Sequence, residues 1–389
     1  MRFTVYSNDW FLEKLDNVCQ FVRDGTHGSF KDVEIGIPLL SAKDIFDGKI
    51  NINENSRLIS IDDYNTIHKN YELTKGDILL TIVGTIGRTA MVNMDEKFTL
   101  QRSVAILRVN EQISYNFLYY YIQTSAFQNR LKSVVNQSAQ GGVYLNSLKK
   151  LNIKLTADMN EQNKISSFLS IIDKKIKLLE QKYQYYQEFK KYLMQKIFAQ
   201  ELRFNFTDDW NYMNFSEIFK SVSTKKYQIK SADILDKGDF EVIDQGQDEI
   251  AGYFNDKTKL CQELPIIIYG DHTTFVKFRD KPFIVGADGV KLLIPKFNAN
   301  PKYLFYALEH FNIKPEGYKR HFSIIKKIKL PIPTLEEQNE ISEIFTYIDI
   351  KLKYTKIQLQ ETEEFKKGLL QQMFVVQLIL SLLQNKKHI

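Results

Sequence analysis

Side chains that can contact phosphate groups or the edges of nucleic acid bases gather around a glycine-containing turn in the first half of the chain. Arginine and glutamine form paired hydrogen bonds with guanine and adenine, and serine and threonine bind phosphate. We therefore predict nucleic acid contacts, with Arg102 as the strongest candidate, at Thr85, Arg88, Gln101, Arg102 and Ser103. The alternative is that Gly84 and Gly87 only build a hairpin and that Arg88 faces solvent.

A polar loop with the sequence NQSAQGG follows at residues 136–142. Its amide and hydroxyl groups can follow a nucleic acid backbone, which makes Gln140 a further candidate contact. The alternative is a plain flexible linker.

The second half carries a concentrated positive charge. Between residues 314 and 329 the only acid is Glu316, against six lysines and arginines, so this segment holds +5 of the chain's net charge of +6. Such concentration is typical of a surface that faces DNA. We predict nucleic acid contacts here and in the 270–274 loop, at His272, Thr273, Lys319, Arg320, Lys326 and Lys327. The alternative is a solvated edge strand on which lysines prevent aggregation.

The sequence contains no recognisable motif for catalysis, cofactor binding or metal binding. No phosphate-binding G-x-x-x-x-G-K-[ST] motif occurs, and Asn300-Pro301-Lys302-Tyr303 has a lysine where an adenine methyltransferase would have its second proline. This tetrapeptide instead resembles a helix start. His272 and His321 lack Cys or carboxylate neighbours at ligand spacing. We expect no catalytic residue, bound cofactor or metal in this chain.

Length and composition predict an ordinary globular protein. The 389 residues are 43% hydrophobic and 26% charged, enough for two or three domains. Two cysteines, Cys19 and Cys261, and an N-terminus without an apolar segment predict a cytoplasmic protein without a secretory signal. The longest apolar run, at 375–383, is far shorter than a membrane span requires.

An internal repeat organises the chain. Residues 161–198 and 337–374 align without gaps at an offset of 176, with 17 identities in 38 positions. Apolar residues follow steps of four and three, as in a coiled coil, although Thr355 and Thr362 interrupt the second copy. At 1.5 Å per residue each helix would reach about 57 Å. Two such helices in one chain are expected to pack on each other.

Further markers repeat outside these helices. Arg2-Phe3 with Asp9-Trp10 recurs as Arg203-Phe204 with Asp209-Trp210, and a basic strand, at 149–155 and at 326–332, precedes each helix. The intervening halves differ in sequence, and each is expected to be α/β or α+β with a helix near its end, at 115–133 and at 301–311. The predicted layout is a first domain at 1–155, a helix at 156–200, a second domain at 201–332, a helix at 333–376 and a tail at 377–389.

The ordered and duplicated motifs resemble the DNA specificity subunit of type I restriction-modification systems. The resemblance covers nearly the whole chain and depends on GDILLTIVGTIGR, FIVGADGVKLL, PIPTLEEQNEIS and EFKKGLLQQMF. It implies two target recognition domains, separated by two conserved helices that form an antiparallel coiled coil. The chain departs from the family pattern in KLTADMNEQ, which lacks the prolines of the second helix entry, and in its C-terminal tail.

The resemblance also implies a function. Each recognition domain would bind one half of a split site in double-stranded DNA. The non-catalytic chain would bind two methyltransferase subunits and, through them, restriction endonuclease subunits, with S-adenosylmethionine, ATP and Mg on those partners. The alternative is a coiled-coil scaffold with two protein-binding globular domains. Salt separates the two hypotheses, because phosphate contacts weaken steeply as salt rises.

Overall fold

The computed structural model describes residues 6, 9–46, 48–136, 141–286, 288–317 and 319–375. The chain divides into two compact units, one made of residues 1–179 with 358–389 and the other of residues 180–357. Each unit is described by itself below. Gln140, the Arg2-Phe3 marker and the predicted tail at 377–389 lie outside the described residues.

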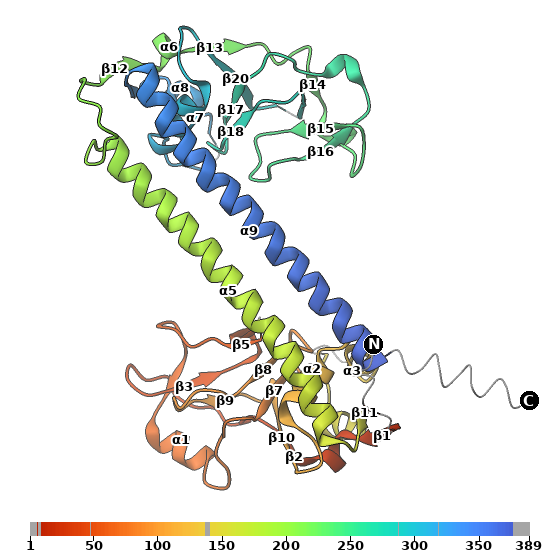
Figure 1. Ribbon diagram of the computed structural model, residues 1–389. Helices are drawn as coiled ribbons and strands as arrows, with labels where there is room; N and C mark the ends of the chain where they lie inside the picture. Colours follow the sequence, from red (N-terminus) through yellow and green to blue (C-terminus); the bar gives the residue numbers. More distant parts are fainter. Residues whose placement is uncertain are drawn as a thin grey trace, which may run out of the picture. The chain divides into compact units, whose positions relative to one another are not determined.

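The globular part of unit 1 is built on a four-stranded antiparallel sheet in the order β2-β10-β7-β8 (Figure 1). Its strands are β2 (Cys19–Asp24), β10 (Val104–Val109), β7 (Ile78–Thr81) and β8 (Thr89–Met91). Smaller sheets are β6 (Leu58–Ile59)-β3 (Ile37–Leu40)-β9 (Thr99–Leu100), β1 (Trp10–Lys14)-β11 (Asn152–Thr156) and β4 (Ile45–Phe46)-β5 (Lys49–Ile50). The short helices are α1 (Ile61–Ile67), α2 (Tyr115–Ile122), α3 (Ser125–Ser133) and α4 (Leu145–Lys149).

The globular part of unit 2 repeats this plan with a second four-stranded antiparallel sheet, in the order β13-β20-β17-β18. Its strands are β13 (Phe219–Val222), β20 (Val290–Pro295), β17 (Ile266–Gly270) and β18 (Val276–Arg279). The other sheets are β14 (Gln228–Ile229)-β19 (Ile284–Gly286)-β15 (Phe240–Ile243)-β16 (Gly252–Phe254) and β12 (Asn211–Asn214)-β21 (Lys329–Ile332). The short helices are α6 (Phe215–Ile218), α7 (Pro301–His310) and α8 (Phe322–Ile325).

The structure corrects two details of the sequence prediction. The single helix expected at 115–133 is two helices, because the Thr124 hydroxyl accepts a hydrogen bond from the Phe127 amide and donates one to the Tyr121 carbonyl, which starts α3 anew. The basic strand expected from residue 326 begins only at Lys329, since α8 and its C-terminal residues occupy the preceding positions.

The two long helices are α5 (Met159–Phe198) and α9 (Leu335–Val375). Unit 1 holds the start of α5 and the end of α9, and unit 2 holds the end of α5 and the start of α9. The predicted apolar seam is buried at Ile165, Leu169 and Ile172 of α5 and at Ile341, Phe345 and Ile348 of α9. Thr355 and Thr362 are also buried, and each hydroxyl donates to the carbonyl four residues earlier. The predicted architecture with its internal repeat is confirmed.

Two residues separate the strand from the long helix at each entry: β11 ends at Thr156 and α5 begins at Met159, and β21 ends at Ile332 and α9 begins at Leu335. Asp158 caps α5 by accepting hydrogen bonds from two amides of its first turn, and the Thr334 hydroxyl accepts one from Glu337 in α9. The missing prolines therefore change neither the length of this turn nor the presence of a cap. No helix in the described part of the chain is long and apolar enough to cross a membrane.

Candidate nucleic-acid interface

The turn between β7 and β8 presents two of the predicted contact residues to solvent. The Thr81 hydroxyl donates to the Thr85 carbonyl and accepts from the Arg88 amide at 2.9 Å, which fixes the turn from inside. Gly87 has a φ of +94°, and a Cβ there would lie 2.1 Å from the Gln128 side chain, so glycine is required. Thr85 and Arg88 are both exposed.

The residues 101–103 form a second turn beside the first. The Ile82 and Val83 amides donate to the Ser103 carbonyl at 2.9 and 3.3 Å, and the Arg102 amide donates to the Thr26 carbonyl at 3.0 Å. The structure thus brings the two predicted segments together. The Ser103 hydroxyl accepts from the Ala42 amide at 3.0 Å, so Ser103 serves to position the neighbouring loop.

Two arginines are the exposed cations of this region. Within the described residues, neither Arg88 nor Arg102 has a side-chain hydrogen bond or ion pair, so both guanidinium groups are available to a ligand. Gln101 is partly buried. The amide of Val143 donates to the Ile82 carbonyl at 2.8 Å, which places the end of the NQSAQGG loop beside the same turns. The 82–88, 101–103 and 141–143 segments are called loop cluster 1 below.

In unit 2, Gln245 joins three loops. It is not among the contact residues that the sequence predicted. Its side-chain carbonyl accepts from the His272 amide at 3.1 Å, its amide group donates to the Asp288 carbonyl at 3.1 Å, and its backbone carbonyl accepts from the Thr273 hydroxyl. The only signal in the sequence is the polar run DQGQD that directly follows a hydrophobic strand. His272 and Thr273 are partly buried by these contacts.

The loop that carries His272 also holds the basic segment. The Asp271 carboxylate accepts from the Phe322 amide at 2.8 Å, and the Asp271 carbonyl accepts from the His321 amide at 2.7 Å. The His321 ring is buried, with Nε2 accepting from the Glu316 amide at 3.0 Å, so its proton lies on Nδ1 and faces the Asp271 carbonyl at 3.1 Å. His321 is therefore used for structure.

The predicted cations of unit 2 are exposed in different settings. Lys319 forms an ion pair with Glu316, which neutralises part of the local charge, whereas Arg320 is exposed without a protein partner among the described residues. Lys326 and Lys327 are exposed just after α8, and Lys326 Nζ lies 4.7 Å from the centre of the Phe322 ring. The 244–248, 270–274 and 288–289 segments, with residues 319–321, are called loop cluster 2 below.

The repeated sequence markers contact each other inside each unit. The Trp10 indole donates to the Glu161 carboxylate at 3.3 Å, and the Trp210 indole donates to Glu337 at 2.9 Å. In unit 2, Arg203 adds two hydrogen bonds to Glu337, at 2.9 and 2.7 Å. These pairs attach the first strand of each globular part to the start of the following long helix.

The glutamine next to each of these glutamates is also buried, and its side chain both accepts and donates hydrogen bonds. Gln162 accepts from the Ser114 amide and donates to the Thr156 carbonyl, both at 2.8 Å. Gln338 accepts from the Asn300 amide and donates to the Pro333 carbonyl, both at 2.9 Å. Each glutamine thus links the end of the last strand, the start of helix α2 or α7 and the long helix.

A tyrosine completes each attachment. Tyr120 donates to Asp173 at 2.8 Å, and Tyr306 donates to Asp349 at 2.7 Å. Burial, together with the nearby aspartate charge, raises the pKa of both phenols, so each remains protonated and acts as the donor. The repeat aligns Asp173 with Asp349, but it does not predict their tyrosine partners, because the tyrosines lie outside the repeated segment.

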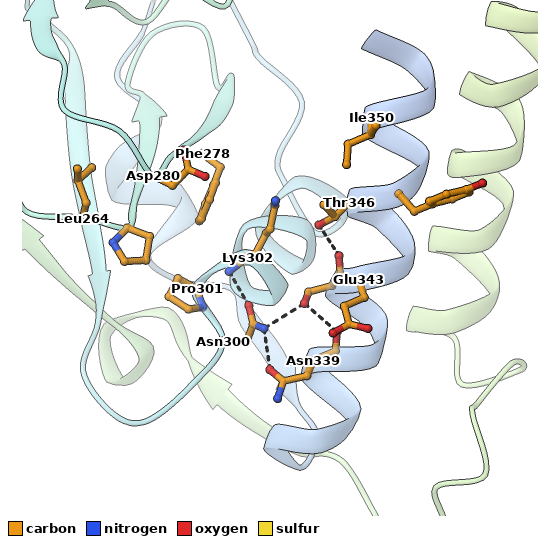
Figure 2. A pocket seen from close by; sticks show the side chains of 13 residues that line it. Leu264, Phe278, Asp280, Asn300, Pro301, Lys302, Asn339, Glu343, Thr346 and Ile350 are labelled. Atoms are coloured by element: carbon orange, nitrogen blue, oxygen red, sulfur yellow. Dashed lines mark hydrogen bonds between the residues drawn. The ribbon is translucent and has the colours of Figure 1, made fainter. Parts of the chain in front are cut away.

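Beside the attachment of unit 2 lies a pocket of about 690 Å³ between the start of α7 and one face of α9. Figure 2 shows the Asn300 side chain among the residues that line it, donating to Asn339 at 2.8 Å and to Ser342 at 3.0 Å. The Asn300 carbonyl oxygen caps α7 by accepting from Lys302 and Tyr303. Asn300-Pro301 is thus the helix start that the sequence predicted. Asn300 also binds the long helix α9.

The family model and the known relatives point to the same group of proteins. The model of the type I restriction modification DNA specificity domain matches twice, at residues 9–185 and 207–364. A putative type I restriction enzyme MjaX specificity subunit from Methanocaldococcus jannaschii is 24% identical over 399 residues, which cover 93% of this chain and 92% of that protein. The type I restriction enzyme EcoBI specificity subunit of Escherichia coli is 26% identical over 220 residues, covering 53% of this chain and 44% of that protein.

The fold has a solved counterpart. The crystal structure of the type I restriction-modification system S subunit from M. genitalium superposes with a TM-score of 0.66 at 17% sequence identity, covering 94% of this chain and 96% of that chain. At this level of identity the likeness concerns the fold. It shows that the fold described above has been seen in a chain of similar length.

Proposed function

Because the chain belongs to the family of type I restriction-modification DNA specificity proteins, we propose that its two globular parts bind the two halves of a split DNA site. Loop cluster 1 would contact one half-site through Thr85, Arg88, Gln101 and Arg102. Loop cluster 2 and the adjacent lysines would contact the other through His272, Thr273, Arg320, Lys326 and Lys327. Gln140, Ser103 and Lys319 remain secondary candidates in this proposal, Ser103 and Lys319 because their side chains already have protein partners.

One observation carries the proposal. The tryptophan, glutamine and tyrosine attachments recur in both globular parts, whereas loop clusters 1 and 2 differ in length, charge and sequence. A duplicated scaffold with unlike loops is what two independent base-recognition sites require, since base identity is determined by the side chains at the base edges. The specificity subunit itself is not an enzyme.

The long helices provide two equivalent surfaces for partner proteins. Unit 1 exposes Ile171, Leu178 and Phe365, and unit 2 exposes the corresponding Tyr347, Tyr354 and Phe189, with 37% to 64% of each side chain accessible. In unit 2, Phe189 and Tyr347 line a mostly apolar groove of about 490 Å³. Two equal apolar surfaces are suited to two copies of one partner, which we propose to be methyltransferase subunits that in turn bind restriction endonuclease subunits.

The cofactors of the system belong to those partners in this proposal. S-adenosylmethionine would be bound by the methyltransferase subunits, and ATP and Mg by the translocating endonuclease, all in the cytoplasm. Methyltransferase activity of the assembled complex should therefore need this chain for site selection and the partner for chemistry. This chain alone, mixed with S-adenosylmethionine and DNA, should transfer no methyl group.

Methylome sequencing of cells that carry this chain with its methyltransferase tests the proposal. We expect one split motif, which disappears when the gene for this chain is deleted. Exchange of residues 203–332 for the second domain of another family member should change one half of the motif only. If both halves change together, the two globular parts do not act as separate recognition sites.

Salt dependence separates this function from the scaffold alternative. Binding of DNA by the complex should weaken steeply as salt rises, because the phosphate contacts of Lys326, Lys327 and the arginines release counterions. Association with a protein partner through an apolar surface would show little salt dependence. Titration of a labelled duplex at several salt concentrations measures the slope.

A further inference from the structure

In unit 2, a lysine from one long helix contacts both the other long helix and the globular part. Lys190 Nζ in α5 lies 2.9 Å from an Asp349 carboxylate oxygen in α9 and 3.1 Å from a Glu309 carboxylate oxygen in α7. It also lies 5.1 Å from the centre of the Tyr306 ring. Only 14% of the Lys190 side chain is exposed. These four residues are called lysine bridge 2.

Unit 1 contains the same arrangement with the helices exchanged. Lys366 Nζ in α9 lies 2.7 Å from an Asp173 carboxylate oxygen in α5 and 3.4 Å from the Gln123 side-chain oxygen just after α2. Its distance to the centre of the Tyr120 ring is 5.8 Å, and 20% of its side chain is exposed. Lys190 and Lys366 correspond in the repeat, as do Asp173 and Asp349. These four residues are called lysine bridge 1.

We propose that Lys190 and Lys366 are positioning residues for DNA recognition, which fix the angle of each globular part on its pair of helix segments. The inference rests on the proposed function. Each lysine contacts three elements at once, and the tyrosine and aspartate of each bridge are already hydrogen-bonded to each other. A cation at their centre holds the helix α2 or α7 against both long helices, whereas the hydrogen bonds of the attachment glutamines and tryptophans each reach only one of them.

The chemistry of bridge 2 favours a permanent cation. Burial acts against the charge on Lys190, but Glu309 and Asp349 outweigh it and raise the pKa of the lysine, which stays protonated. Removing the cation would leave two neighbouring carboxylates without their counterion. The globular part would then gain freedom to turn about the remaining contacts with α9. The adjacent Lys191 is exposed and provides a matched control.

The test uses the full chain assembled with its methyltransferase subunits and duplexes that carry the motif found by methylome sequencing. The spacer between the half-sites is varied by one and two base pairs on either side of its natural length. For Lys190→Met we expect the preference for the natural spacer over its neighbours to fall by about tenfold, the effect of losing one charge-assisted hydrogen-bonded pair. Base preferences within each half-site should stay unchanged.

Two variants test whether the cation itself is responsible. Lys190→Arg keeps the charge and should restore most of the spacer preference, and Lys191→Met should behave as the unmodified chain. A purely structural role would lower the amount of folded complex without changing the ratio between spacers. Unchanged spacer preference in folded Lys190→Met would overturn the proposal.

If Lys190→Met does not fold, Asp349→Asn and Glu309→Gln weaken bridge 2 while they keep its hydrogen-bonding groups. A loosened spacer preference in both then supports the proposal, and an unchanged preference in both refutes it. Failure of the proposed function gives a different result, because the unmodified complex would then methylate no split motif at all.

Discussion

The globular parts of units 1 and 2 are attached to the long helices through equivalent side chains and differ in the loops of clusters 1 and 2. The contacts of tryptophan with glutamate, of glutamine with a helix cap and of tyrosine with aspartate recur in both units. Loop cluster 1 exposes two arginines, whereas loop cluster 2 is organised by Gln245 and Asp271. The attachments to the long helices are alike in the two units, whereas the loops differ and can therefore have different specificities.

The exceptions to this equivalence are equally informative. Gln123 of bridge 1 stands where bridge 2 has Glu309, so the first bridge pairs one cation with one carboxylate and the second pairs one cation with two. Lysine bridge 2 therefore contains one more charged group than lysine bridge 1.

The largest expected effect comes from two phenylalanines that correspond in the repeat. Phe374 in unit 1 packs against Trp10, Phe117 and Tyr121, and Phe198 in unit 2 packs against Trp210, Tyr303 and Phe345. Replacement of either by alanine should lower the free energy of unfolding of its own unit by about 3–5 kcal/mol. Hydrogen exchange should locate the loss in unit 1 for Phe374→Ala and in unit 2 for Phe198→Ala.

The exposed Phe365 and Phe189 also correspond in the repeat and serve as controls, because their replacement by alanine should leave unfolding nearly unchanged. Equal loss of protection in both units from either core variant would show that the units are not separate folding entities.

The buried glutamines Gln162 and Gln338 compare the two units through a smaller expected effect. Gln162→Ala and Gln338→Ala should each cost about 1–3 kcal/mol of unfolding free energy, because backbone groups are left unsatisfied. Gln162 also donates to the Gln112 carbonyl at 3.2 Å, so its loss should be the larger of the two. Chemical denaturation measures both values, with the exposed Asn163→Ala as the control. A smaller loss of unfolding free energy for Gln162→Ala than for Gln338→Ala would show that the number of hydrogen bonds does not determine the loss.

Arg102 tests whether loop cluster 1 determines specificity. If its guanidinium contacts a guanine, Arg102→Ala should cost about 1–3 kcal/mol at one base position and relax the preference there. Binding to a set of duplexes with single base changes measures the pattern. A uniform loss across all duplexes would instead make Arg102 a phosphate contact.

The smallest expected effect concerns the lysines that follow α8. Lys326→Ala and Lys327→Ala should weaken binding to all sequences alike and reduce the slope of the salt dependence by about one unit each. Titrations at several salt concentrations measure that slope. A change confined to one base position would assign these lysines to base recognition.

The sequence predicted those features that depend on local pattern or on the repeat. The 3.5-residue spacing of apolar side chains indicated both long helices, and the glycines at 84 and 87 indicated the β7–β8 turn. The contacts of Gln245, Tyr120 and Tyr306 were missed, because their partners are distant in sequence and no spacing rule connects them. The meeting of the 82–88 and 101–103 turns likewise depends on long-range backbone hydrogen bonds.

The composition of unit 1 has a consequence for the order of folding during synthesis. Its core includes Leu369, Met373 and Phe374 from the end of α9, whereas unit 2 is complete once residue 357 has been made. At 5–20 residues per second, the ribosome needs about 10–40 s to add the residues between the first part of unit 1 and Phe374. During that interval the surface around Trp10 and Phe117 lacks its cover. The globular part that is made first is therefore finished last.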